Sequence, residues 1–180
     1  MDDVWMRTYS GARVHILNPQ PEEIRVEDIA HALSHLCRFC GHVPRFYSVA
    51  QHSVVVSDLL EDLGAPLAFW GLLHDASEAY LHDLHRPLKR SLPGYSELES
   101  RMMAAICDRF GLPRRMPEPV RHADNVALAT EFRDLYGEPL VNCVAWGRAQ
   151  PMETVIRPHC SEVAEDLFLI RFEALARRAA

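Results

Sequence analysis

Long apolar runs are missing from this sequence, and none approaches the roughly 18 residues that a membrane-spanning helix needs. The first five residues do not place a basic stretch before an apolar one, so we expect no signal peptide. The five Cys are odd in number and form no regular framework, which is typical of reduced thiols in a cytosol. The sequence therefore predicts a cytoplasmic protein that has no membrane partner.

Positive charge is also scarce: 19 Lys and Arg stand against 25 Asp and Glu, a net charge of -6. This balance argues against a nucleic-acid-binding surface, which would be basic. A small basic pocket inside an acidic protein can still bind a nucleotide. By contrast, ten His is a high count, and it indicates metal or proton chemistry.

Apolar residues recur at helical spacing along most of the 180 residues, a length that fits one domain. A short β-hairpin is expected over residues 4–17. Pro87 and Pro93 are expected to keep residues 82–90 in a basic, non-helical loop. Residues 137–159 have no regular pattern. We expect helices over residues 27–36, 49–63, 65–81, 96–110, 117–136 and 161–178, and hence an all-α domain.

The helix predicted over residues 65–81 turns polar where it should be buried. Residues 69–73 place apolar groups on nearly all of its sides, and His74, Asp75 and Glu78 follow. Burying such charged groups costs roughly several kcal/mol unless they are paired or bind a metal. His74 and Glu78 share a face, and Asp75 lies about 100° round the helix. A polar exit turn is the alternative interpretation.

Two other predicted helices supply further candidate ligands. His52 lies on the apolar stripe of residues 49–63, and Asp124 lies on that of residues 117–136. A lone His on such a stripe is usually a hydrogen-bonded core residue, but a second candidate ligand, His74, in the next helix favours metal binding by His52. The set His52, His74, Asp75 and Asp124 suits Zn, Mn, Fe, Co or Ni better than Ca or Mg.

Basic and aromatic residues suggest how an anion could be held. Arg38 can grip a phosphate or a base edge and Phe39 can stack beside it, although Arg38 can equally cap a helix end. Lys89 in the basic loop suits an anionic substrate, or else belongs to a solvated connector. His31 and His35 have a spacing that can bind a metal, but the Glu of a zincin motif is missing at Ala32. We interpret this pair as surface or interface histidines.

The order His, His-Asp, Asp on a helical chain resembles the HD-domain metal-dependent phosphohydrolases. The resemblance covers about residues 24–136 and is closest to a small bacterial and phage branch that contains 5'-deoxynucleotidases and a phage dATP triphosphohydrolase. The segments that carry it are Arg38-Phe39, residues 47–53, residues 73–84, residues 87–89 and His122-Ala123-Asp124.

The resemblance implies an all-helical bundle around a single metal centre, over residues 24–136, with a C-terminal loop and helix over 137–180. It implies that His52, His74, Asp75 and Asp124 are ligands, with Asp75 also catalytic. It further implies that Glu78 orients or protonates, that Arg38 contacts phosphate or base, and that Asp83 faces the sugar. Related sequences often have Trp at the position of Phe39 and read Gly-Asp-Leu-Pro where this chain has His82-Asp83-Leu84-His85. Both departures bear on substrate selectivity.

The expected activity is hydrolysis of (deoxy)nucleoside phosphates by a homo-oligomer with a divalent transition metal and, as an option, additional Mg at the substrate phosphates. Release of phosphate from 5'-monophosphates and of triphosphate from dNTPs such as dATP stay as two alternatives. Arg38 and Lys89 would offset negative charge as it develops. A nucleotide-binding sensor without turnover is a third interpretation. A di-iron oxygenase, which would draw on His42 and His82, is a fourth.

Overall fold

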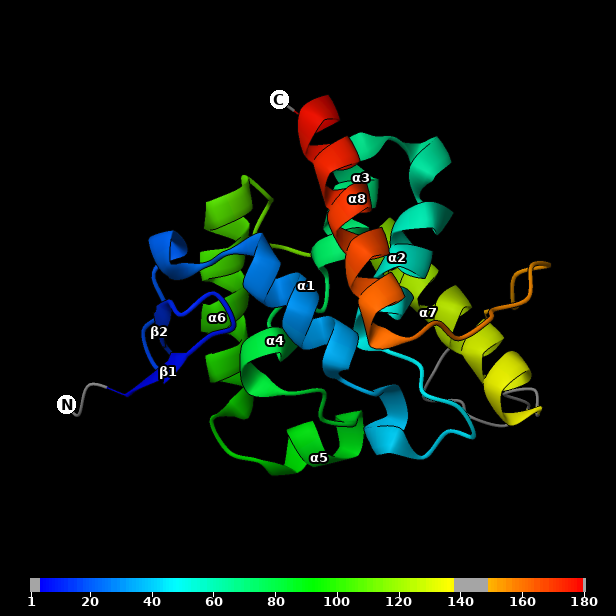
Figure 1. The fold of residues 1–180 in the computed structure, drawn as a ribbon, viewed down its shortest axis with the longest axis horizontal. Helices are drawn as coiled ribbons and strands as arrows, with labels where there is room; N and C mark the ends of the chain where they lie inside the picture. Colours follow the sequence, from blue (N-terminus) through cyan, green and yellow to red (C-terminus); the bar gives the residue numbers. More distant parts are fainter. Residues whose placement is uncertain (1–3, 138–148, 180) are drawn as a thin grey trace.

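The computed structural model describes residues 4–137 and 149–179, and it confirms a mainly helical protein with a short N-terminal hairpin (Figure 1). The strands are β1 (Trp5–Arg7) and β2 (Arg13–His15). The α-helices are α1 (Val26–His35), α2 (Val49–Leu59), α3 (Ala65–Leu73), α4 (Glu78–Leu81), α5 (Arg86–Ser91), α6 (Tyr95–Phe110), α7 (Glu118–Glu131) and α8 (Ser161–Ala179). Short 3-10 turns lie at Pro21–Glu23, Arg38–Gly41 and Glu61–Leu63, and a π-helical turn, Phe132–Tyr136, extends α7. None of the helices described is long and apolar enough to cross a membrane.

The N-terminal hairpin is fastened to α1. Strands β1 and β2 are antiparallel, with Met6 opposite Val14, and the Val14 side chain is fully buried. At the turn, Ser10 donates its backbone N–H and its hydroxyl to the Asp28 carboxylate, at 2.6 and 2.9 Å. These two bonds satisfy a buried carboxylate, so the hairpin is held against the helical body.

Helices α1, α2, α3 and α8 enclose most of the core. Helix α8 lies beside α1 and α2 although α1 and α8 are far apart in sequence (Figure 1), and it buries Phe168 and Leu175. Helices α2 and α3 approach closely at Gly71, where a Cβ atom would lie 2.6 Å from Leu60 Cδ1 and 3.3 Å from the Val56 carbonyl oxygen. The absence of a side chain at Gly71 therefore permits this helix crossing.

The predicted helix over residues 65–81 is broken in two. Helix α3 ends at Leu73, a turn spans residues 74–77, and α4 begins at Glu78. Within the turn, Ala76 donates its N–H to the Leu73 carbonyl and Glu78 donates to the Asp75 carbonyl. Both bonds span three residues, so the chain winds more tightly here than in an α-helix. The break falls at His74 and Asp75, the doublet singled out in the sequence.

The prediction that residues 82–90 form a non-helical loop was wrong, because α5 covers residues 86–91. Pro87 lies in the first turn, where the missing N–H would have no partner within the helix. His85 is the N-cap, and its ring accepts a bond from the Leu88 N–H at 3.4 Å. The helix returns Lys89 toward α4, where it contacts Glu78.

The irregular segment before α8 is held by one side chain of α2. Gln51 donates to the Arg157 carbonyl at 2.8 Å and accepts from the His159 N–H at 2.9 Å. Residues 149–160 contain no helix or strand, as expected, and residues 138–148 of the predicted irregular region lie outside the described residues. The pair of bonds fixes where α8 begins relative to α2.

Candidate metal centre

His52 and His74 bring their Nε2 atoms together in the interior. His52 comes from near the N-terminal end of α2, and Ser48 caps that helix as predicted by accepting a bond from the Gln51 N–H at 3.1 Å. His74 follows the last residue of α3. Both side chains are buried, and their Nε2 atoms are 3.3 Å apart.

Two carboxylates join the imidazoles. Asp75 Oδ2 lies 3.2 Å from His74 Nε2 and 3.7 Å from His52 Nε2. Asp124 Oδ1, from α7, lies 3.3 Å from His52 Nε2 and 3.9 Å from His74 Nε2. Neighbouring ligands of one ion with bonds of about 2.0–2.2 Å are roughly 3 Å apart. His52, His74 and Asp124 could therefore hold a metal ion, and Asp75 lies within reach of the same point.

The outer nitrogens of both rings fit a metal centre. His74 Nδ1 is 2.8 Å from the Gly71 carbonyl, which can only accept, so this nitrogen carries the proton. His52 Nδ1 lies 2.6 Å from Glu131 Oε1, again an acceptor. In the neutral rings both Nε2 lone pairs then face the same point, and they need a cation or a proton between them. The donor set fits a divalent transition metal on this observation.

The field of the site favours positive charge at the same point. Burial lowers the pKa of His74, but Asp75 and Asp124 outweigh that effect and raise the pKa to about 9. For His52, burial and Arg38 lower the pKa, and Glu131 and Asp124 outweigh them. A cluster that draws protons onto imidazoles in this way also attracts a cation.

Glu131, at the end of α7, joins the metal cluster to Arg38, although it is not among the residues predicted from the sequence. Its side chain is fully buried and accepts from Arg38 Nε and Nη2 at 3.1 and 2.9 Å as well as from His52. Glu131 lies seven residues after Asp124, on the same stripe of α7 as the buried Ala127. A carboxylate at that spacing on an apolar stripe was the signal that could have found it.

Arg38 is held in place by its backbone as well as by Glu131. Its N–H donates to the Tyr47 carbonyl at 2.9 Å, just before α2. The next residues, Phe39 and Cys40, have φ values of +56° and +52°, which non-glycine residues rarely adopt. Arg38 Nη1 remains directed at Asp75 Oδ2, 3.8 Å away. The guanidinium therefore borders the metal cluster on one side of a pocket.

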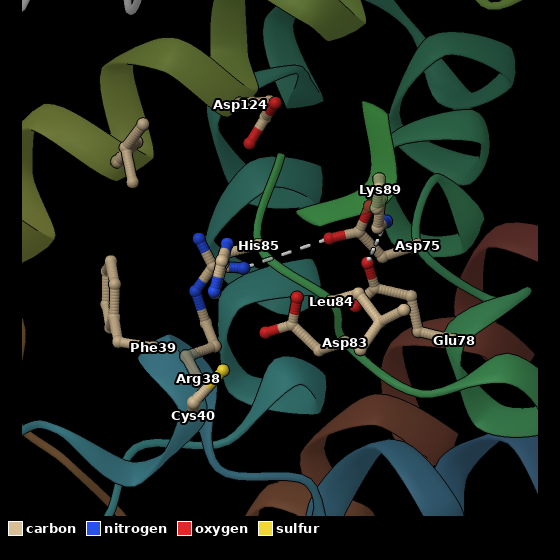
Figure 2. A pocket seen from close by; sticks show the side chains of 11 residues that line it. Arg38, Phe39, Cys40, Asp75, Glu78, Asp83, Leu84, His85, Lys89 and Asp124 are labelled. Atoms are coloured by element: carbon tan, nitrogen blue, oxygen red, sulfur yellow. Dashed lines mark hydrogen bonds and ion pairs between the residues drawn. The ribbon is translucent and has the colours of Figure 1, made fainter. Parts of the chain in front are cut away.

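That pocket, of about 140 Å³, gathers the substrate-binding candidates. Figure 2 shows Arg38, Asp83 and Glu78 around one space, with ion pairs drawn from Arg38 to Asp75 and from Lys89 to Glu78. Its lining comprises Arg38, Phe39, Cys40, Asp75, Glu78, Asp83, Leu84, His85, Lys89, Asp124 and Leu128. Every sequence-predicted substrate residue, Arg38, Phe39, Asp83 and Lys89, therefore lies at the same pocket as two candidate ligands.

Glu78 faces this pocket from the first turn of α4. Its Oε1 accepts from Lys89 Nζ at 3.0 Å, and Lys89 also donates to Glu99 of α6 at 2.7 Å. Burial, with the nearby carboxylates of Asp75 and Asp83, raises the pKa of Glu78 well above its usual value despite Lys89. Oε2 is buried and has no hydrogen-bond partner in the described part of the chain. This environment favours the protonated form of Glu78 more than water does, while Lys89 favours the charged form.

A second hollow, of about 700 Å³, reaches the cluster from another side. It shares Asp75 and Asp124 with the first pocket and also touches His74. Three arginines line it: Arg90, Arg114 and Arg121. The candidate metal centre therefore lies between a small pocket and a wider one with basic groups.

The fold and the site define a helical protein with a buried histidine–aspartate cluster that could hold a metal ion. No family model matches the chain. It is 45% identical over 131 residues to the uncharacterized protein YfdR of Escherichia coli, covering 73% of this chain and 72% of YfdR. It is 38% identical over 148 residues to the uncharacterized protein RCAP_rcc00048 of Rhodobacter capsulatus, covering 76% of each chain. The chain belongs to the family of these two proteins.

Proposed function

We propose that this protein is an HD-domain phosphohydrolase that cleaves (deoxy)nucleoside phosphates at the His52, His74, Asp75 and Asp124 cluster. One observation carries the proposal: two buried imidazoles and two partly buried carboxylates meet at a pocket that also holds Arg38 and Glu78. Such a set binds divalent transition metals, and a fixed cation beside it suits a phosphate.

The four residues would hold the ion through the Nε2 atoms of the imidazoles and the carboxylates of Asp75 and Asp124. When bound, the ion lowers the pKa of a water molecule and polarises a phosphoryl oxygen. Arg38, pre-oriented by Glu131, offsets the negative charge that develops on the phosphoryl group. It needs no reorganisation for this role because two of its nitrogens are already bound.

Glu78 acts as the general acid in this proposal. Its raised pKa favours the protonated form that a general acid needs, and Lys89 fixes the position of Oε1. Asp83 and Phe39 line the same pocket and would contact the nucleoside. Asp83 presents hydrogen-bond acceptors suited to a sugar hydroxyl, and the Phe39 ring offers a stacking face.

Both phosphate alternatives agree with this arrangement. A monophosphate needs only the Arg38 side of the cluster, whereas a triphosphate tail could extend into the wider hollow with Arg90 and Arg121. The oxygenase alternative is less favoured because a second iron would need further inward ligands. His42 and His82, which that alternative would use, are both exposed.

The test is a panel of deoxy- and ribonucleoside mono-, di- and triphosphates, incubated with metal-stripped protein to which Mn, Co, Zn or Mg is added. Free phosphate from monophosphates, or triphosphate from dNTPs, would support the proposal and select between the two reactions. Asp75→Ala should abolish turnover, whereas Asp62→Ala, an exposed Asp outside the cluster, should retain it. A metal-loaded protein that is silent across the panel would refute hydrolysis and favour the sensor or the oxygenase.

A further inference from the structure

A second group of metal-ligand side chains lies at the surface, where α1 meets α8. His31 and His35 are one turn apart on α1, and Glu165 belongs to the first turns of α8. Their candidate ligand atoms all lie within 4.8 Å of one another. None of the three residues lines the pockets around the first cluster.

The His31 ring already contacts the carboxylate. His31 Nδ1 is 3.1 Å from Glu165 Oε2, a separation that suits either a shared proton or two ligands of one ion. The ring is held by its neighbours: Tyr9 stacks on it at 3.7 Å between centroids with an interplanar angle of 10°, and the tilted ring of His35 lies at 4.3 Å. Ordered rings of this kind lose little freedom when an ion binds.

His35 supplies the second imidazole, and one of its ring nitrogens lies within 4.8 Å of ligand atoms of His31 and Glu165. His35 Nδ1 lies 2.8 Å from the His31 carbonyl, so it carries the proton and leaves the lone pair on Nε2. Ser34, fully buried, lies 3.1 Å from His35 Nδ1 and 3.5 Å from Glu165 Oε2. As for His74 in the first cluster, a backbone carbonyl therefore fixes which ring nitrogen carries the proton.

Further donors lie at the N-terminal end of α8. Glu162 is exposed, and its pKa is lowered by its own backbone N–H, by Cys160 and Ser161, and to a smaller extent by nearby His35. The Glu162 carboxylate is thus available near His35 to complete the coordination, and water can do so as well. Two imidazoles and one carboxylate suit Zn²⁺, Co²⁺, Ni²⁺ or Cu²⁺ better than Mg²⁺ or Ca²⁺.

We propose that His31, His35 and Glu165 form a second divalent transition-metal site, separate from the His52 cluster, that joins α1 to α8. The alternative is an ordinary surface pair of His31 and Glu165, in which His35 only packs on the His31 ring and bonds to its carbonyl. The inference does not depend on phosphohydrolase activity, because the two groups share no residue.

Binding of Zn²⁺ to the metal-stripped full-length protein tests the site, measured by equilibrium dialysis in the presence of excess Mg²⁺. We expect wild type to bind one more ion per chain than His35→Gln or Glu165→Gln, with at least tenfold weaker binding of that ion in either variant. His42→Ala, which removes another exposed His, is the matched control and should bind as wild type does. Circular dichroism checks that each variant keeps its helices.

The comparison between variants decides the outcome whatever the first cluster binds. Equal numbers of ions in wild type, His35→Gln and Glu165→Gln would overturn the proposal. So would loss of the same ion in His42→Ala. A hydrolase that lacks this second ion would leave the proposed function standing, and an inactive protein that binds it would leave this site standing.

Discussion

Glu131→Gln tests how far one buried carboxylate organises the candidate metal centre. Glu131 is fully buried and accepts from two nitrogens of Arg38 and from His52 Nδ1. Glutamine has nearly the same shape but only one acceptor atom. If that oxygen serves Arg38, the amide NH₂ faces the His52 N–H, donor against donor. One bond to a charged group is then lost, and the Arg38 guanidinium is left without its nearest counter-ion.

Breaking a buried ion pair by changing one partner costs about 3–5 kcal/mol, and the retained bond places this case at the lower end, about 3 kcal/mol. For a chain of this length each kcal/mol shifts Tm by roughly 2–4 °C, so we expect a loss of about 6–12 °C in the metal-free protein. His52 can also relieve the clash by moving its proton to Nε2, which removes a ligand lone pair. We therefore expect metal affinity to fall about 10–100-fold.

Thermal unfolding followed by circular dichroism, with and without metal, separates the two effects. Glu118→Gln is the control, because Glu118 is 82% exposed and pairs only loosely with Arg121, at 3.4 Å. A Glu131→Gln protein whose metal-free Tm and metal affinity both match those of the control would refute this account of Glu131.

Three further changes probe other features. Gly71→Ala should destabilise the fold by about 1–3 kcal/mol in urea unfolding, since the new Cβ would meet Leu60 at 2.6 Å and backbone at 3.3 Å; an unchanged midpoint would mean that the helices can separate freely. Glu78→Gln should keep its metal, measured by elemental analysis, yet lose about 10²–10⁴ in kcat; loss of the ion would make Glu78 a ligand. The Arg133 side chain lowers the pKa of Asp134, so this carboxylate stabilises the fold above its usual pKa and ceases to do so as pH falls through the lowered value. Asp134→Asn should therefore lower Tm at pH 6 by an amount that shrinks as the pH falls below the usual pKa of Asp, and a pH-independent difference would contradict this.

Local signals in the sequence predicted those helices in which the apolar stripe and the capping residues indicate the same bounds. Helix α2 begins after Ser48 as predicted, but it ends at Leu59, and a separate 3-10 turn fills residues 61–63 before Gly64. Helix α6 begins within one residue of its expected start. The residues around Pro87 were predicted wrongly because the penalty of proline inside a helix was applied to a position in the first turn. The break after Leu73 carried no local signal, since residues 65–81 are all compatible with a continuous helix.

At the candidate site, too, some residues had a local signal in the sequence and others had none. His52, His74 and Asp124 could be selected because each is polar on a stripe that must be buried, and the structure brings them together. Contacts between elements carried no such signal. Lys89 of α5 donates to Glu99 of α6, and because residues 82–90 were predicted to be non-helical, no spacing in the sequence could have indicated this contact.

The placement of α8 has a consequence for how the chain folds. All four candidate ligands of the first cluster precede Gly137, yet α1, α2 and α3 share their core with Phe168 and Leu175. During synthesis, α2 and α3, which carry candidate ligands, keep an apolar face uncovered until α8 has been made. These late, long-range contacts have a high loop-closure cost, so we expect the final docking of α8 to limit the folding rate. The two hydrogen bonds between Gln51 and residues 157 and 159 would then hold α8 in its docked position.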